Sequence, residues 1–160
     1  MISELLLPKL AEWQPSGVGR HSWSHTLPDQ GWNLYITADK ADSLGCLIWE
    51  LSATRTYLIP ATLQGVRSWT DRLASKASGL MEPLRVIEVD STRLEAILRS
   101  DSPSSRGENV FYYEVKIMGQ SRGELRRYQT SPKLANRREQ VPFALTHEVI
   151  AKFFSDLIAD

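Results

Sequence analysis

The chain of 160 residues has little cysteine and no long apolar run. Cys46 is its single cysteine, which excludes an intramolecular disulfide framework and a zinc site built on paired cysteines. No stretch approaches the roughly 20 apolar residues of a membrane span, so we expect a soluble protein. Residues 1–5 lack the basic segment and long apolar core of a signal peptide. Together these features predict a cytoplasmic location.

Sequence motifs of catalysis and of phosphate binding are also missing. The chain contains no Gly-x-Ser-x-Gly, no Gly-x-Gly-x-x-Gly and no Gly-x-x-x-x-Gly-Lys-Ser/Thr. His21 and His25 would lie about 13 Å apart along a strand, too far to share one metal ion. Cys46 lies in an apolar run that is typical of a core strand. We therefore predict no catalytic residue, no metal and no cofactor, and we favour a protein without enzymatic activity.

The chain has the composition of an ordinary globular domain. Hydrophobic residues make up 42% and charged residues 24% of it. The chain is long enough to form a hydrophobic core without disulfide bonds or a structural metal ion. No internal repeat divides the sequence. We therefore predict one domain over residues 1–160.

The spacing of apolar residues predicts three strands in the first third of the chain. Apolar and polar residues alternate over 20–26, 32–37 and 44–54, and the segments between them, 27–31 and 39–43, have the composition of turns. We expect these strands to form an antiparallel meander.

A helical period follows. One stripe, capped at its start by Thr62, consists of Leu63, Val66, Trp69, Leu73 and Ala77. A second amphipathic helix, capped by Thr146, ends the chain. An N-terminal helix begins near Pro8 or kinks there, because proline cannot donate an interior hydrogen bond.

Residues 84–100 are harder to interpret, since 91–99 fits either a strand or a helix. We prefer a strand, because residues 111–117 and 124–130 are clear strands and the polar run 100–108 fits the loop before them. The Pro, Gly and Ser content of 100–108 predicts a flexible surface loop. The fold class is therefore α+β, with about six or seven antiparallel strands in a curved or barrel-like sheet and N-terminal, central and C-terminal helices.

The chain has no net charge, yet basic residues concentrate in one segment. Eight basic and three acidic residues lie between 102 and 138. Aromatic and basic side chains interleave on the two strands there, and they form a candidate anion-binding patch of Tyr112, Lys116, Arg122, Arg126 and Arg127. The preferred interpretation is a solvated sheet face whose arginines pair with the acidic C-terminal segment. Binding of single-stranded nucleic acid is a lesser alternative, and we expect none.

Five tryptophans are more than a core of this size needs, and tryptophan concentrates at interfaces and in ligand cavities. The main hypothesis is a binding or adaptor protein whose partner is another protein or a second copy of the chain, with no membrane partner. The alternative is a small-molecule carrier or minor enzyme. Its pocket would lie between the sheet and the central helix, near Trp49, Tyr57 and Trp69.

Overall fold

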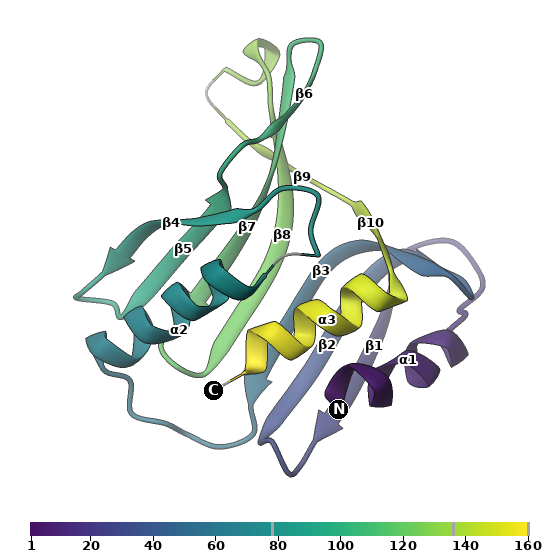
Figure 1. Ribbon diagram of the computed structural model, residues 1–160. Helices are drawn as coiled ribbons and strands as arrows, with labels where there is room; N and C mark the ends of the chain where they lie inside the picture. Colours follow the sequence, from purple (N-terminus) through teal and green to yellow (C-terminus); the bar gives the residue numbers. More distant parts are fainter. Residues whose placement is uncertain (78, 136, 160) are drawn as a thin grey trace.

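The computed structural model describes residues 1–77, 79–135 and 137–159, which form one antiparallel sheet with three α-helices on one of its faces (Figure 1). The helices are α1 (Ile2–Glu12), α2 (Leu63–Lys76) and α3 (His147–Ile158), and Pro132–Leu134 forms a 3-10 turn. The strands are β1 (His21–Leu27), β2 (Trp32–Ala41), β3 (Gly45–Arg55), β4 (Leu84–Asp90), β5 (Glu95–Ser100), β6 (Ser104–Arg106), β7 (Asn109–Met118), β8 (Arg122–Thr130), β9 (Glu139–Val141) and β10 (Phe143–Thr146). The α+β prediction is confirmed. The sheet has more strands than predicted and is open, not a barrel.

The main path of the sheet runs β1-β2-β3-β8-β7-β5-β4. Its two central strands pair only where residues 51–54 of β3 oppose residues 122–125 of β8. Beyond that point β10 pairs with the start of β3, and β9 pairs with the end of β8. The short segment 139–146 therefore fills the space where the two central strands separate. Strands of three and four residues show too little alternation to be predicted from the sequence, so these two strands were not expected.

The helices cover one face, and the hydrophobic core lies between them and the sheet (Figure 1). Helix α2 packs on β4 and β5, whereas α3 packs on β3, β10 and α1. The predicted caps are confirmed: Thr62 Oγ1 accepts the N–H of Gly65 at 3.0 Å, and Thr146 Oγ1 accepts that of Val149 at 3.3 Å. No helix in the described ranges is long and apolar enough to cross a membrane.

Helix α1 corrects one of the two alternatives expected at Pro8, and a kink at that residue stays a prediction. It begins at Ile2 and contains Pro8, so it does not begin near that proline. An interior proline costs about 3 kcal/mol, but Leu6 and Leu10 are completely buried. Because full burial of a leucine contributes about 1.5 to 3 kcal/mol, packing of these two side chains offsets the cost.

Of the ambiguous segment 91–99, residues 95–99 belong to a strand, as preferred, since β5 pairs with β4 on one side and β7 on the other, whereas 91–94 form the turn between β4 and β5. The following polar run contains β6, which pairs with the start of β7. Ser104 in β6 also donates a hydrogen bond to Glu82. The flexibility of residues 100–108 stays a prediction.

Candidate binding groove

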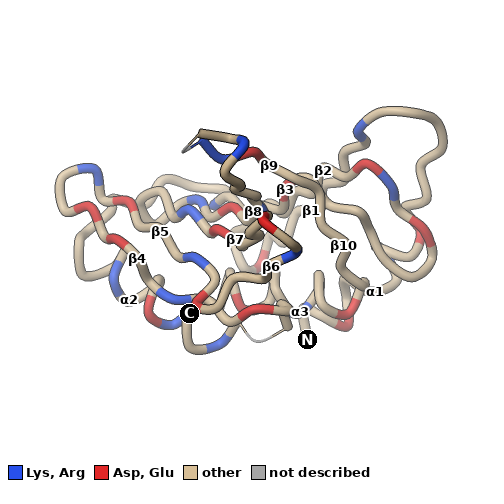
Figure 2. The backbone as a smooth tube through the Cα atoms, turned by 90° about the horizontal axis from the view of Figure 1, so that it is seen from above, with Lys and Arg blue, Asp and Glu red and all other residues tan. Residues whose placement is uncertain are grey.

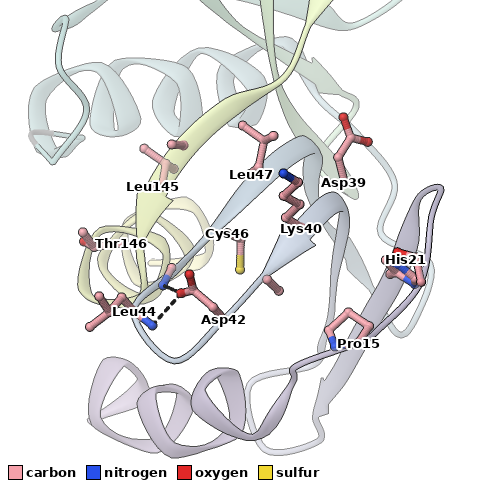
Figure 3. Close-up of a pocket in the computed structure, with 14 residues that line it drawn as sticks. Pro15, His21, Asp39, Lys40, Asp42, Leu44, Cys46, Leu47, Leu145 and Thr146 are labelled. Carbon is pink, nitrogen blue, oxygen red and sulfur yellow. Dashed lines mark hydrogen bonds between the residues drawn. The ribbon is translucent and has the colours of Figure 1, made fainter.

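A hollow lies at one end of the sheet, where the α1–β1 connection, the β2–β3 hairpin and β10 meet (Figure 3). Its volume is about 590 Å³. In Figure 3 His21 and Pro15 stand across the hollow from Leu44 and Thr146, with Cys46 between them. We call this hollow the groove. Its lining includes the apolar side chains of Leu44, Cys46, Leu47 and Leu145.

The hairpin that forms one wall is held by a side-chain cap. The Asp42 carboxylate accepts the N–H groups of Leu44 at 2.8 Å and Gly45 at 3.0 Å, and these bonds lower the pKa of Asp42. At Gly45 a Cβ atom would lie 2.4 Å from the carbonyl oxygen of Leu145. Only glycine therefore allows β10 to approach this closely, and the wall is preformed by the backbone.

The rim of the groove exposes apolar side chains. Leu44 at the hairpin tip is 76% exposed, and Val18 is fully exposed in the connection that also supplies Pro15 and Gly17 to the lining. A single exposed leucine is ordinary, whereas a contiguous apolar patch beside an apolar hollow is typical of interaction sites.

The two carboxylates that line the groove already have structural partners. Asp42 holds the hairpin, and Asp39 forms an ion pair with Arg20 at 3.1 Å. The guanidinium of Arg20 also lies 3.6 Å from the ring centre of Trp49. The groove therefore offers apolar surface and few uncommitted groups that could orient a reacting substrate.

Cys46 does not have the properties of a nucleophile. Burial, with a further contribution from Asp42, raises the pKa of its thiol from 9.0 to about 12. A catalytic cysteine needs the opposite shift. The nearby His147 is buried, and its Nε2 atom has no hydrogen-bond partner among the described residues. The thiol is therefore a neutral part of the apolar lining.

We expect the native Cys46 thiol to react with iodoacetamide at pH 8 about a thousandfold more slowly than the same thiol in the unfolded chain. A pKa of about 12 in place of 9.0 lowers the thiolate fraction at pH 8 by that factor. Mass spectrometry after timed alkylation, with and without denaturant, measures both rates. Equal rates would show that the thiol is ionised or exposed in the folded protein.

No metal site is visible in the described part of the chain, which holds no cluster of three or more His, Cys, Asp or Glu residues suited to an ion. His21 and His25 both lie half-buried on the helix-covered side of β1. Trp23 between them is stacked on His25, with ring centres 6.1 Å apart.

Of the three residues predicted to line a pocket by the central helix, Trp69 lines a cavity there, whereas Tyr57 and Trp49 are not among the residues that line it. Trp69 on α2 lines a cavity of about 210 Å³ together with Trp32 and Arg55. The Arg55 guanidinium lies 4.3 Å from the Trp32 ring centre and donates to the Tyr57 hydroxyl at 3.4 Å. Trp49 lies outside the core cluster, under Arg20. Binding of a ligand in this cavity stays a prediction.

The candidate anion-binding patch divides between the two faces of the sheet. Arg122 and Arg126 lie on the open face, where both pair with Glu50 and Glu124. Arg127 lies on the opposite face, buried against Glu82. Period-two alternation along β8 already implied this separation, because consecutive residues of a strand point to opposite faces.

The other two residues of the patch, Tyr112 and Lys116, also have neighbours within the sheet. Tyr112 packs on Tyr128, with ring centres 5.9 Å apart, and the guanidiniums of Arg99 and Arg138 lie over these two rings. Lys116 is opposite Glu124 in the register of β7 and β8. Figure 2 shows basic and acidic residues interspersed along these strands. The expected pairing with the C-terminal helix is wrong for these arginines: among the described residues their carboxylate partners are Glu50, Glu114 and Glu124 of the sheet and Glu82 in the connection before β4.

We expect no micromolar binding of fluorescent single-stranded DNA or RNA at low salt. The arginines of the open face are paired with glutamates and cover the rings on which bases would stack. Fluorescence anisotropy titration of both nucleic acids checks this. Binding that weakens steeply with salt and is lost in Arg126→Ala would contradict it.

Comparison of the chain with protein-family models, with curated proteins and with solved structures gives no match. Function therefore has to be inferred from the geometry of the described residues.

Proposed function

We propose that the protein is a non-catalytic binding protein that holds an apolar, extended segment of another protein in the groove. The observation that supports this function is the apolar hollow of about 590 Å³ with Leu44 exposed at its rim. Release of water from such surface stabilises a complex by roughly 25 cal/mol per Å² of apolar area. The proposed site of action is the cytoplasm, in agreement with a single cysteine that is reduced.

A protein segment fits the groove better than a small molecule does. Small-molecule sites use a few convergent polar groups to orient the ligand, whereas Asp39 and Asp42 here are committed to Arg20 and to the hairpin backbone. The apolar rim at Leu44 and the nearby Val18 extend the contact surface beyond the hollow. An extended segment can cover both the hollow and its rim.

Selection from a phage-displayed library of random peptides tests the proposal. The immobilised protein is the bait, and enriched peptides are synthesised and their affinities measured by fluorescence anisotropy. We expect enrichment of peptides with two or more large apolar residues and dissociation constants in the micromolar range. Leu44→Arg should weaken binding by about tenfold or more, because it places a charge on the rim.

Leu58→Arg is the matched control. Leu58 is 96% exposed but does not line the groove, so the same change there should leave peptide affinity within about twofold. Failure of the library to enrich any peptide over the bare support, or equal affinities for wild type and Leu44→Arg, would overturn the proposal.

A second candidate function is a small-molecule carrier, which the cavity beside Trp69 favours. Since Trp32 and Trp69 both line it, a ligand bound there would change the tryptophan fluorescence. A screen of small aromatic carboxylates by fluorescence quenching tests this candidate. Quenching that disappears in Ser68→Trp, which would fill the cavity from α2, is the expected sign of a carrier.

A further inference from the structure

The sheet has two terminal strands on its main path, β1 and β4, and they differ in how their edges are protected. The edge of a sheet presents unpaired backbone groups that another strand can use, so proteins usually protect it with charges, bulges or covering helices. β4 has all three: Arg85 and Glu88 are exposed, its register is broken between Val86 and Glu88, and α2 packs against it.

β1 has neither charge nor bulge. All seven residues pair with β2 in an unbroken register, from His21 opposite Ala38 to Leu27 opposite Trp32. The strand contains no proline, lysine, arginine, aspartate or glutamate. Burial, with a contribution from Lys9, lowers the pKa of His25, which disfavours its charged form. In the described part of the chain β1 pairs with no strand other than β2.

The strand is also complementary to itself. Residues 21–25, His-Ser-Trp-Ser-His, read the same in both directions. An antiparallel pair of such strands centred on Trp23 would place Trp23 opposite its equivalent and Ser22 opposite Ser24. Aromatic pairs and hydroxyl pairs across strands are each favourable, and no like charges meet. The exposed side chains of Ser22 and Ser24 are small enough not to obstruct an approaching strand.

We propose that β1 is a dimer interface, at which the β1 strands of two copies of this chain pair antiparallel about a two-fold axis at Trp23. A second copy fits this edge for a further reason: the chain has no net charge, so two copies approach without long-range repulsion. Such an interface is isologous and closes at two copies. The two sheets then join into one, and His21, which lines the groove of each copy, becomes part of the interface.

Sedimentation velocity of the full chain tests the proposal. At about 50 µM wild type should sediment as a dimer of twice 18.1 kDa. In the double variant Ser22→Lys/Ser24→Lys, the new lysine at position 22 of each copy would lie opposite the new lysine at position 24 of the other copy. Repulsion between their ammonium groups should raise the dissociation constant of the dimer by at least about tenfold. The control Ser43→Lys/Ser105→Lys adds the same charge at exposed serines outside β1 and should remain dimeric.

Cysteine pairing provides a second readout, because the buried thiol of Cys46 does not compete. Under mild oxidation a mixture of Ser22→Cys and Ser24→Cys chains should form a covalent dimer, whereas each variant alone should not. Directly opposed residues lie within disulfide range, and residues two positions out of register do not. A monomeric wild type, a dimer unaffected by the lysines of the double variant, or covalent dimers of Ser24→Cys alone would overturn the proposal.

Discussion

Replacement of Trp69 by alanine is expected to lower the free energy of unfolding by about 3 to 5 kcal/mol. The side chain is 5% exposed, and its ring centre lies 5.7 Å from that of Trp32. Its indole N–H donates to the carbonyl of Leu157 at 2.8 Å. Truncation would therefore leave a cavity between α2 and the sheet and remove the bond that ties α2 to the end of α3.

Urea denaturation followed by circular dichroism measures this change. Arg67→Ala, on the exposed side of the same helix, is the matched control and should stay within about 0.5 kcal/mol of wild type. Trp69→Phe should give an intermediate loss of about 1 to 3 kcal/mol, since it keeps a ring but leaves the Leu157 carbonyl without its donor. A Trp69→Ala variant within about 1 kcal/mol of wild type would contradict the packing described above.

Arg127→Met is expected to destabilise the protein by about 3 to 5 kcal/mol, because it leaves the buried carboxylate of Glu82 without its countercharge. The two groups form a bidentate pair with N–O distances of 3.2 and 2.9 Å. Ser100 also donates to Glu82 at 2.6 Å, so the carboxylate is the centre of a network below β4 and β5. The guanidinium lies 4.2 Å from the ring centre of Tyr113 as well.

Glu82→Gln in the Arg127→Met background separates loss of charge pairing from loss of packing. The amide keeps an acceptor for Ser100 but has no charge to desolvate, so the double variant should be more stable than Arg127→Met alone. A coupling energy of about 1 to 3 kcal/mol is expected from the double-mutant cycle. Additive losses would mean that the pair contributes through packing alone.

The same network predicts a direction of pH dependence. Burial alone would raise the pKa of Glu82, but hydrogen bonds from Arg127, Ser100 and Ser104 outweigh it and the pKa is lowered. The stabilisation is therefore present above the ordinary value of 4.5 and is lost as the pH falls through the lower pKa of the folded state. Unfolding free energies of wild type should fall in that range more steeply than those of Glu82→Gln.

The parts of the fold that could be predicted from sequence are those with a long, regular apolar period. The stripe through Val66, Trp69 and Leu73 is buried as expected, and the alternation in β2 places Leu34 and Ile36 in the core. Helix α1 was predicted less well, because burial of its leucines overrides the local effect of Pro8.

The groove could not be predicted, because three separate segments form it. Residues 42–45 have a recognisable turn composition, but one wall is β10, whose four residues give no periodic signal. Pairing of Leu145 with Cys46 is a tertiary contact across about 100 positions. For the same reason the sequence could not show that Glu50 and Glu124 neutralise Arg122 and Arg126.

Chemical-shift mapping of a selected apolar peptide on the isotopically labelled protein tests the central claim, that the groove is the binding site, most directly. The largest amide shifts are expected at Leu44, Cys46 and Leu145, with none above noise at Leu58 or along α2. A peptide that binds but shifts residues of α2 and the cavity beside Trp69, and leaves the β2–β3 hairpin unchanged, would contradict the claim.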